Sequence, residues 1–422
     1  MLLSRTVMIR SSVSRGLARA WFSSGPVGKP RVLVVGAGWA GYRAAQDIDK
    51  NKYDVHVISP RNHFLFTPLL PSTTVGTLEF RAIQEPVRTI PHIHYYQSVV
   101  QHINFNENSI TCNDIFKEGY TFDLKYDILI LAPGSETNTL NVQGVLNNPN
   151  VFFLKQLRHA RAIRNRLIDC FERASSPAVT SDAERRTLLT FLIVGGGPTN
   201  VEFASELHDF IAGDVAKWYP DLLPFVSIKL IEASGHILGT FNEALVGYVE
   251  KLFFSRHINL LTSRTIKTVK ENTAFLSDNT TIEFGMMVWS TGIKQVPLVE
   301  NLPEAIVKKF HNRRLMVDKN LRLLSPHTGH AHHNVFALGD CAGDQDKPLP
   351  ALAQVASQQA QYIARVINNS SVQDIQGGYV SGFKYAHLGS MANVGEWKGI
   401  YDSPSVGKGS CMCMCTCMGM GV

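Results

Sequence analysis

Two glycine-rich loops, far apart along this chain, restrict its possible folds more than any other feature. The first reads Gly36-Ala37-Gly38-Trp39-Ala40-Gly41 and the second Gly195-Gly196-Gly197-Pro198-Thr199-Asn200. Each follows a run of aliphatic residues and precedes a helical pattern. A buried strand, a tight glycine turn and a helix place backbone N–H groups against a pyrophosphate. The two loops together predict an α/β chain with two Rossmann-like dinucleotide-binding domains, which suits a flavin facing a nicotinamide.

The two halves of the chain repeat one order of elements. In the first half, a buried strand at 126–131 ends shortly before Gly134. In the second half, the second strand of the unit ends at Glu232, and the later strand Met286–Trp289 ends shortly before Gly292. The repetition supports two folds of the same kind in one chain.

A third short apolar strand marks the return to the first fold. It covers Asn334–Leu338 and leads into Gly339-Asp340. We therefore predict that the first domain comprises residues 31–155 and 325–400, and that the second domain, residues 156–324, is inserted into it.

Acidic residues at strand ends indicate which nucleotide each fold binds. A carboxylate at Glu232 would accept hydrogen bonds from an adenosine ribose and repel a 2′-phosphate, which favours NADH over NADPH. The first fold has Ser59-Pro60-Arg61 at the equivalent place, which alone would suit NADP, but the later Asp340 favours FAD. The nucleotide-binding residues expected at the loops and strand ends are Gly36, Gly38, Gly41, Gly134, Gly195, Gly197, Glu232, Gly292 and Asp340.

The second loop departs from the usual pattern at its third glycine position. Asn200 stands there, so we expect its helix to lie slightly farther from the strand. Glu202 follows in the first helical turn, near the expected meeting point of nicotinamide and flavin. On its position alone, Glu202 could equally be a residue that complements the helix dipole.

The first residues of the chain have the composition of a mitochondrial presequence. Basic residues from Arg5 onward, together with many serines, precede the first acidic residue, Asp47. We expect residues 1–25 to be a presequence, and a basic disordered start is the alternative. No apolar run is long enough to span a bilayer, and no basic surface with interleaved aromatic residues indicates nucleic acid.

Cysteine and histidine clusters give weak signals for metal binding. Cys112, Cys170 and Cys341 are isolated and are expected to be core or edge residues. Four more cysteines alternate with methionines in the tail at 401–422, a pattern that suits soft metals, but we favour an atypical or truncated end. The histidines at 327–333 have no nearby carboxylate or thiol, so we predict no metal site.

Several motifs together resemble one enzyme family. The segments 64–71, 195–199, 288–292 and 353–358 are similar to those of the type II NADH:quinone oxidoreductases, the rotenone-insensitive alternative NADH dehydrogenases of mitochondria and bacteria. The resemblance covers about residues 31–400. It implies a flavoprotein whose NADH domain is inserted into its FAD domain, and which passes a hydride from NADH to FAD and two electrons to ubiquinone without proton pumping.

The resemblance also implies roles for individual residues. Gln354 and Gln358 match the AQxxxQ motif that lines the quinone site, and their spacing puts both amides on one helical face. Glu202 matches an acid between the nicotinamide and quinone sites that takes part in proton or charge transfer. Thr67 and Pro68 belong to an apolar loop that packs around the flavin.

The resemblance further implies a peripheral position on the mitochondrial inner membrane and a possible homodimer. Relatives continue into an amphipathic segment that binds the membrane, whereas Gly407–Ser410 runs directly into the cysteine and methionine tail here. We therefore expect weaker membrane attachment.

Other protein classes remain as alternatives. A disulfide or sulfide:quinone reductase needs a close cysteine pair beside the flavin, and the isolated cysteines do not form one in the sequence. A redox-sensing or death-signalling flavoprotein that binds NADH but turns over slowly fits the same two folds. Rapid turnover with a soluble quinone would distinguish the enzyme from the sensor.

Overall fold

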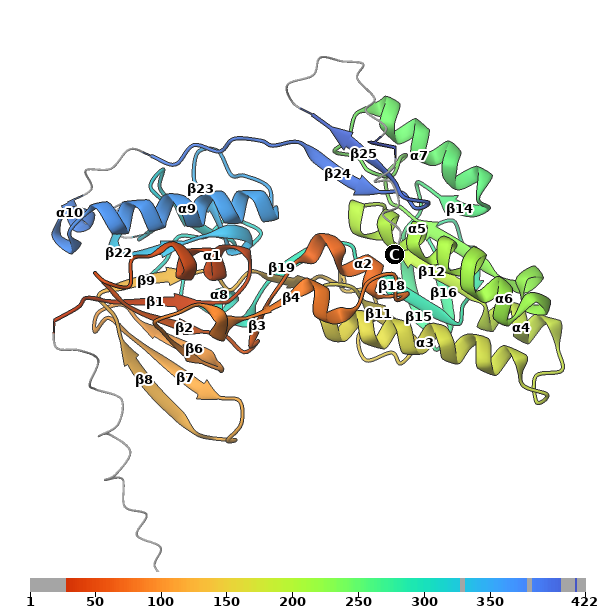
Figure 1. Cartoon of the computed structure of the whole chain (residues 1–422), viewed down its shortest axis with the longest axis horizontal. Helices are drawn as coiled ribbons and strands as arrows, with labels where there is room; N and C mark the ends of the chain where they lie inside the picture. The colour runs from red at the N-terminus through yellow and green to blue at the C-terminus, as the bar shows by residue number, and fades with distance from the viewer. Residues whose placement is uncertain (1–27, 327–330, 378–381, 404–413, 416–422) are drawn as a thin grey trace, which may run out of the picture.

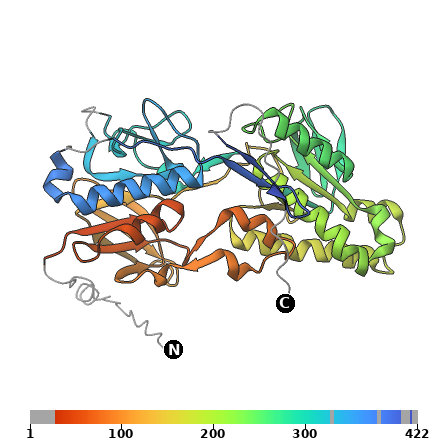
Figure 2. The same cartoon turned by 45° about the horizontal axis from the view of Figure 1, so that its top comes forward.

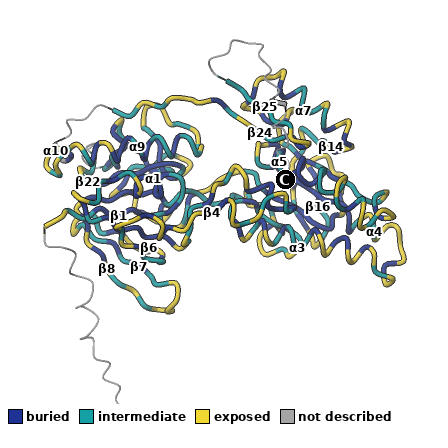
Figure 3. The backbone as a smooth tube through the Cα atoms, in the orientation of Figure 1, coloured by how far each residue is buried: buried dark blue, intermediate teal, exposed yellow. Residues whose placement is uncertain are grey.

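The computed structural model describes residues 28–326, 331–377, 382–403 and 414–415. The expected presequence at 1–25, most of the tail at 401–422, and His327 and His330 lie outside these residues. The described chain forms two lobes joined by extended segments (Figure 1). Buried residues concentrate along the strands of both lobes (Figure 3).

An eight-stranded sheet forms the first lobe. Its strands are β1 (Arg31–Val35), β2 (Asp54–Ile58), β5 (Ile93–Tyr96), β9 (Ile128–Leu131), β20 (Leu315–Val317), β21 (Arg322–Leu324), β22 (Ala331–Ala337) and β23 (Ala342–Asp344). They lie in the order β23-β20-β21-β22-β9-β1-β2-β5. The five strands from β22 to β5 are parallel, and every residue of β9 is buried, as expected for a sheet covered on both faces.

The second lobe contains a smaller, all-parallel sheet. Its strands are β11 (Val151–Phe153), β12 (Thr190–Val194), β13 (Ser227–Ile231), β14 (Ile258–Leu261) and β18 (Met286–Trp289). They lie in the order β11-β18-β12-β13-β14. The order β18-β12-β13-β14 repeats β9-β1-β2-β5 of the first lobe, so the prediction of two Rossmann-like folds is confirmed.

Helices cover the sheets through apolar faces. In the first lobe, α1 (Trp39–Asp47) packs beside α9 (Ala353–Asn369), whose buried residues recur every three or four positions (Figure 1). The principal helices of the second lobe are α3 (Leu157–Ser175), α5 (Pro198–Phe210) and α7 (Glu243–Ser255). Among the described residues, no helix is long and apolar enough to cross a membrane.

Shorter elements complete the two lobes. The remaining helices are α2 (Leu70–Thr73), α4 (Asp182–Leu188), α6 (Ala216–Trp218), α8 (Pro297–Glu300) and α10 (Val372–Gly377), and the single-turn segments are η1 (Thr67–Leu69), η2 (Phe80–Ile83), η3 (Val87–Thr89), η4 (Ile211–Val215), η5 (Pro220–Phe225) and η6 (Gly339–Cys341). The remaining strands are β3 (His63–Leu65), β4 (Gln84–Pro86), β6 (Ser98–Asn104), β7 (Ser109–Asp114), β8 (Thr121–Lys125), β10 (Ser135–Thr137), β15 (Ile266–Lys270), β16 (Thr273–Leu276), β17 (Thr281–Glu283), β19 (Ile293–Gln295), β24 (Ser390–Asn393), β25 (Lys398–Asp402) and β26 (Met414–Cys415).

The strands do not follow the predicted domain boundaries at 155 and 324. β11 precedes residue 155 but pairs with β18 in the second sheet. β20 and β21 precede residue 324 but belong to the first sheet. The chain crosses between lobes through the antiparallel pair β10 and β19, so the inserted domain ends near that pair. Short apolar strands carry no sequence signal for the sheet they join, which explains the misplaced boundaries.

The end of the described chain also departs from the prediction that 325–400 lies in the first domain. Residues 382–389 run from the first lobe toward the second, where the hairpin of β24 and β25 lies (Figures 1 and 2). Ala392, Val394 and Ile400 are buried in the same hydrophobic core as α5 and α7. We call residues Ser390–Asp402 the C-terminal hairpin.

Candidate active site

The first glycine loop allows very close packing of the helix and two strands. Gly36 has φ +107°, and a Cβ atom there would lie 2.2 Å from the carbonyl oxygen of Ala132. A Cβ atom on Gly41 would lie 2.0 Å from the carbonyl oxygen of Gly36. Only glycine fits at either position, because the end of β9 and the start of α1 both contact this loop.

Other positions at the same edge of the sheet are open. A Cβ atom on Gly134, at the end of β9, would meet nothing within 4 Å, and one on Gly38 would meet only the Arg61 guanidinium, at 3.7 Å. The N-terminus of α1 has no side-chain cap, so its first N–H groups are available to a ligand. This cradle fits the pyrophosphate of FAD.

Asp340 lies at the carboxyl end of β22, where the sequence analysis places it. The Ser135 hydroxyl donates a hydrogen bond to Asp340 Oδ2 at 2.6 Å. Lys155 Nζ donates to Ser135 Oγ at 2.8 Å and lies 4.0 Å from Asp340 Oδ2. Burial lowers the pKa of Lys155, and the nearby Asp340 carboxylate opposes that shift. Lys155 and Ser135 were not predicted from the sequence, since nothing in their local pattern marks them.

The apolar loop with Thr67 and Pro68 lies against the first turn of α1. Trp39 Nε1 donates a hydrogen bond to Thr67 Oγ1 at 3.0 Å. The Trp39 ring also meets Phe64 edge-on, with centroids 5.1 Å apart. The loop is therefore held next to the first glycine loop, as expected for residues that surround a flavin.

The second glycine loop replaces close packing with hydrogen bonds. Gly195 again has φ +107°, while Asn200 is buried and its Nδ2 donates to the carbonyl oxygens of Val194 and Gly195 at 2.7 and 2.8 Å. A Cβ atom on Gly197 would meet nothing within 4 Å, and the N-terminus of α5 has no side-chain cap. Gly292, with φ +70°, follows β18 at the same edge. The loop keeps the turn and open space that a dinucleotide needs.

Glu232 lies beside this loop at the end of β13. Its Oε2 accepts from the Gly196 N–H at 2.5 Å, and its Oε1 accepts from the N–H and hydroxyl of Ser234, both at 2.7 Å. Burial alone would raise the pKa of Glu232, but these hydrogen bonds outweigh it and lower the pKa. A negative charge beside the loop would repel a 2′-phosphate.

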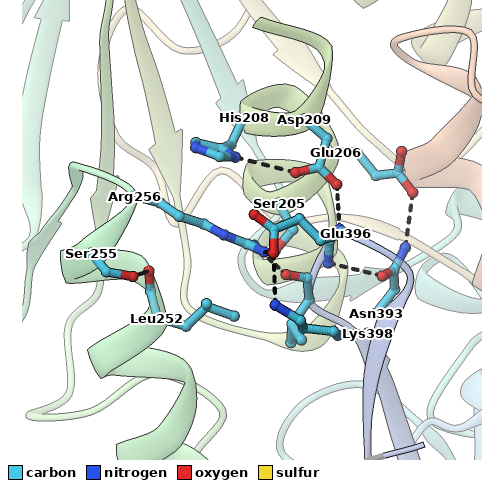
Figure 4. Close-up of polar contacts among 12 residues, drawn as sticks. Ser205, Glu206, His208, Asp209, Leu252, Ser255, Arg256, Asn393, Glu396 and Lys398 are labelled. Atoms are coloured by element: carbon cyan, nitrogen blue, oxygen red, sulfur yellow. Dashed lines mark hydrogen bonds and ion pairs between the residues drawn. The ribbon is translucent and has the colours of Figure 1, made fainter. Parts of the chain in front are cut away.

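Glu202 and Glu206 lie one turn apart on α5. Glu202 Oε1 accepts from the Asn393 N–H at 3.2 Å, and burial raises the pKa of Glu202 to about 8, with a smaller contribution from Glu206. Glu206 accepts hydrogen bonds from Ser72, Thr77 and Asn393 side chains at 2.7, 2.6 and 2.8 Å. The contact between Asn393 and Glu206 is drawn in Figure 4. Because the pKa of Glu202 is raised to about 8, its carboxyl group holds a proton at neutral pH.

Glu206 and Asn393 were missed in the sequence analysis. The spacing of Glu202 and Glu206 by four residues would have revealed the first, since such residues share a helical face. Asn393 had no detectable signal, because it reaches α5 only through the fold of the C-terminal hairpin.

Charged residues fasten the C-terminal hairpin to the second lobe (Figure 4). The buried Arg256 side chain donates to the Val394 carbonyl oxygen and lies 3.1 Å from Glu396 Oε2. Asp209 Oδ2 accepts from the Glu396 N–H at 2.5 Å. These contacts fix the hairpin, and hence Asn393, against α5.

The amides of Gln354 and Gln358 contact the segment just before the hairpin. Gln354 donates to the Gly389 carbonyl oxygen and accepts from the Leu388 N–H, both at 3.0 Å. Gln358 donates to the Ala386 carbonyl oxygen at 2.8 Å and accepts from the Ala386 N–H at 3.0 Å. Each amide retains one N–H for a further acceptor. Residues 386–393 thus connect the glutamines of α9 with the acids of α5.

Cysteines take no part in this arrangement. Cys112, Cys170 and Cys341 are buried and unpaired, which confirms their expected place in the core. The fold therefore brings no cysteine pair together among the described residues.

Comparisons with known proteins agree with this geometry. Residues 30–360 match the family described as pyridine nucleotide-disulphide oxidoreductase. The chain is 41% identical over 398 residues to a probable NADH dehydrogenase of Dictyostelium discoideum, covering 93% of this chain and 85% of that protein. It is 34% identical to external NADH-ubiquinone oxidoreductase 2 of Saccharomyces cerevisiae, covering 89% and 73% of the two chains. The solved structure of NDH2 from Plasmodium falciparum in complex with NADH aligns with TM-score 0.83 at 28% identity, covering 89% and 90%.

Proposed function

This chain belongs to the type II NADH:quinone oxidoreductases, within the pyridine nucleotide-disulphide oxidoreductase family, and we propose that it oxidises NADH in the second lobe and reduces ubiquinone beside α9. It is an FAD-dependent enzyme that does not pump protons. The observation that carries the proposal is the pair of glycine loops, each with φ +107° at its first glycine, at equivalent edges of two equivalent sheets.

Each nucleotide has a distinct set of residues to hold it. Gly36, Gly38 and Gly41 cradle the FAD pyrophosphate at the start of α1, and Asp340 accepts hydroxyl groups of the same cofactor. Bound FAD supplies two-electron redox chemistry between a hydride donor and a quinone. Gly195 and Gly197 cradle NADH, and Glu232 accepts its ribose hydroxyls and disfavours NADPH.

Glu202 supplies the proton that the reaction consumes. NADH, one proton and ubiquinone yield NAD⁺ and ubiquinol, so one proton must come from solvent. With its pKa raised to about 8, Glu202 carries that proton at pH 7 and can release it once a basic quinol oxygen forms nearby. The Asn393 N–H holds the carboxyl group in place, and Glu206 in turn holds the Asn393 side chain.

Gln354 and Gln358 orient the quinone. Their remaining N–H groups are donors for a quinone carbonyl oxygen, while their other contacts fix residues 386–389. Leu388, Met391 and Trp397 are exposed by 66%, 66% and 84% in and just after this segment. Apolar side chains at this place support attachment to the surface of the mitochondrial inner membrane, where ubiquinone is dissolved. Dimerisation is also expected from the family.

Anaerobic stopped-flow absorbance of the FAD-loaded protein tests the assignment. NADH should bleach the flavin, and a soluble ubiquinone should restore its colour. Gln358→Ala should slow the second step about tenfold, equal to a lost hydrogen bond of about 1.4 kcal/mol, and leave the first unchanged. Gln361→Ala, on the same helix, is the matched control. If quinone does not restore the flavin, or if Gln358→Ala slows only the NADH step, the assignment is wrong.

Liposome flotation tests the proposed membrane attachment, and light scattering tests dimerisation. Trp397→Ser should reduce flotation at physiological salt, and the protein should have the mass of a dimer. Unchanged flotation of the variant would place the membrane contact elsewhere.

A further inference from the structure

Three potential metal ligands meet at the edge of the first sheet, away from both nucleotide loops. Asp54 and His56 are two residues apart on β2, so their side chains lie on one face of the sheet. His94 on β5 is directly opposite His56 in the strand register. These residues could not be connected from the sequence, because it does not reveal how β2 and β5 pair.

The distances suit a single cation. His56 Nε2 lies 2.8 Å from Asp54 Oδ2, and His94 Nε2 lies 3.4 Å from Asp54 Oδ1. One ligand atom from each of the three residues lies within 4.8 Å of the other two. In a tetrahedral zinc site with bonds of about 2.0 Å, neighbouring ligand atoms are about 3.3 Å apart. The His56 and His94 rings are stacked with centroids 4.5 Å apart, and an imidazole nitrogen binds a metal in the plane of its ring. The exposed His94 side chain must therefore rotate out of this stack before all three atoms can coordinate one ion.

The surroundings fix one ligand and leave another open to solvent. His56 is 4% exposed, and its ring is held beside Asp54 on one face of the sheet. The His56 Nδ1 atom is buried without a hydrogen-bond partner. The ring is therefore hydrogen-bonded through Nε2, to Asp54. The His94 side chain is 54% exposed, which leaves an approach from solvent.

We propose that Asp54, His56 and His94 bind one divalent transition-metal ion of the zinc, cobalt or nickel class, with water completing the coordination. Two imidazoles and one carboxylate are typical ligands for these ions. Asp54 is at the start of β2, whereas the glycine loop follows the end of the adjacent β1. The metal would link β2 to the edge strand β5, far from the redox centre, and stabilise that edge.

One cation competes with the metal. Arg31 Nε lies 3.4 Å from Asp54 Oδ2, so an incoming metal must displace this contact and tolerate the nearby charge. Removing the arginine should therefore tighten metal binding. Adventitious binding at a surface histidine would show no such dependence.

Cobalt titration of the FAD-loaded full chain tests the proposal. Cys411, Cys413, Cys415 and Cys417 are first replaced by serine, and bound metal is removed with a chelator. Co²⁺ should then bind at about one equivalent, with a visible ligand-field band typical of an imidazole and carboxylate site. His94→Ala should weaken binding about tenfold or more, because it removes one of three ligands. His102→Ala, an exposed histidine on β6, is the matched control.

Arg31→Gln is a variant that should change Co²⁺ affinity in the opposite direction. It should tighten Co²⁺ binding roughly thirtyfold, the repulsion in water between one unit charge and a divalent ion about 4 Å away. Asp54→Asn replaces His94→Ala as the ligand variant if the latter does not fold. The proposal is overturned if the parent protein does not bind one equivalent, if the ligand variants bind as tightly as the parent, or if Arg31→Gln weakens binding.

Discussion

Replacing Glu202 by glutamine should stabilise the FAD-loaded protein at neutral pH. Burial raises the pKa of Glu202 from 4.5 to about 8, so folding forces a proton onto a group that is ionised in the unfolded chain. Glutamine has nearly the same shape, needs no proton, and can still accept the hydrogen bond from Asn393.

The size and sign of the effect follow from proton linkage. Below pH 4.5 Glu202 is protonated in both the folded and the unfolded state, so it does not lower the free energy of unfolding. As the pH rises toward 8, stability falls by about 1.36 kcal/mol per pH unit, because only the unfolded state ionises. At pH 7 Glu202 lowers the free energy of unfolding by about 3 kcal/mol, and Glu202→Gln removes this loss. The gain in the free energy of unfolding, variant over parent, should therefore be near zero at pH 4.5 and largest above pH 8.

Thermal unfolding followed by flavin fluorescence across pH 5 to 8 is the assay. Glu202→Gln should raise Tm by several degrees at pH 7 and by much less at pH 5. Glu206→Gln is the control on the same helix and should lower Tm instead, because an amide nitrogen would face hydroxyl donors from Ser72 or Thr77. A Tm difference for Glu202→Gln that is equal at both pH values, or negative at pH 7, would refute the reasoning.

Three further outcomes are expected. Glu232→Gln should raise the ratio of NADPH to NADH efficiency, measured as kcat/KM for each; an unchanged ratio would remove Glu232 from the ribose site. Gly36→Ala should abolish FAD retention, measured by absorbance after gel filtration, because the new Cβ atom would lie 2.2 Å from a carbonyl oxygen. The control Gly247→Ala, on α7, should retain FAD because its Cβ atom would meet no atom within 4 Å. Arg256→Met should expose the C-terminal hairpin to limited proteolysis, because it removes an ion pair and a backbone contact; an unchanged cleavage pattern would contradict that role.

Local patterns predicted the elements to which we assign nucleotide binding. The strand Met286–Trp289 has the predicted bounds, and both glycine loops lie between a strand and a helix as expected. These features depend on a few adjacent residues, so the sequence contains them in full. Gly36 and Gly195 even share the same backbone angle.

Contacts between distant segments could not be predicted in the same way. Asn393 binds α5 only because the hairpin turns onto the second lobe, and β20 joins the first sheet only because β23 and β21 flank it. The amides of Gln354 and Gln358 were expected to face a quinone, yet each also makes two backbone contacts with residues 386–389. Such pairings depend on tertiary packing, which neither periodicity nor spacing encodes.

The core of the second lobe has a consequence for the order in which the protein folds. Its buried residues include Leu65 and Leu70 from the first half of the chain as well as Ala392 and Ile400 from the hairpin. A ribosome or an import channel delivers these segments at very different times. The second lobe cannot complete its core until residue 400 has emerged, so its parallel sheet must wait with part of its apolar surface uncovered. An excised fragment containing only the inserted domain would have the same defect permanently, and we expect it to aggregate.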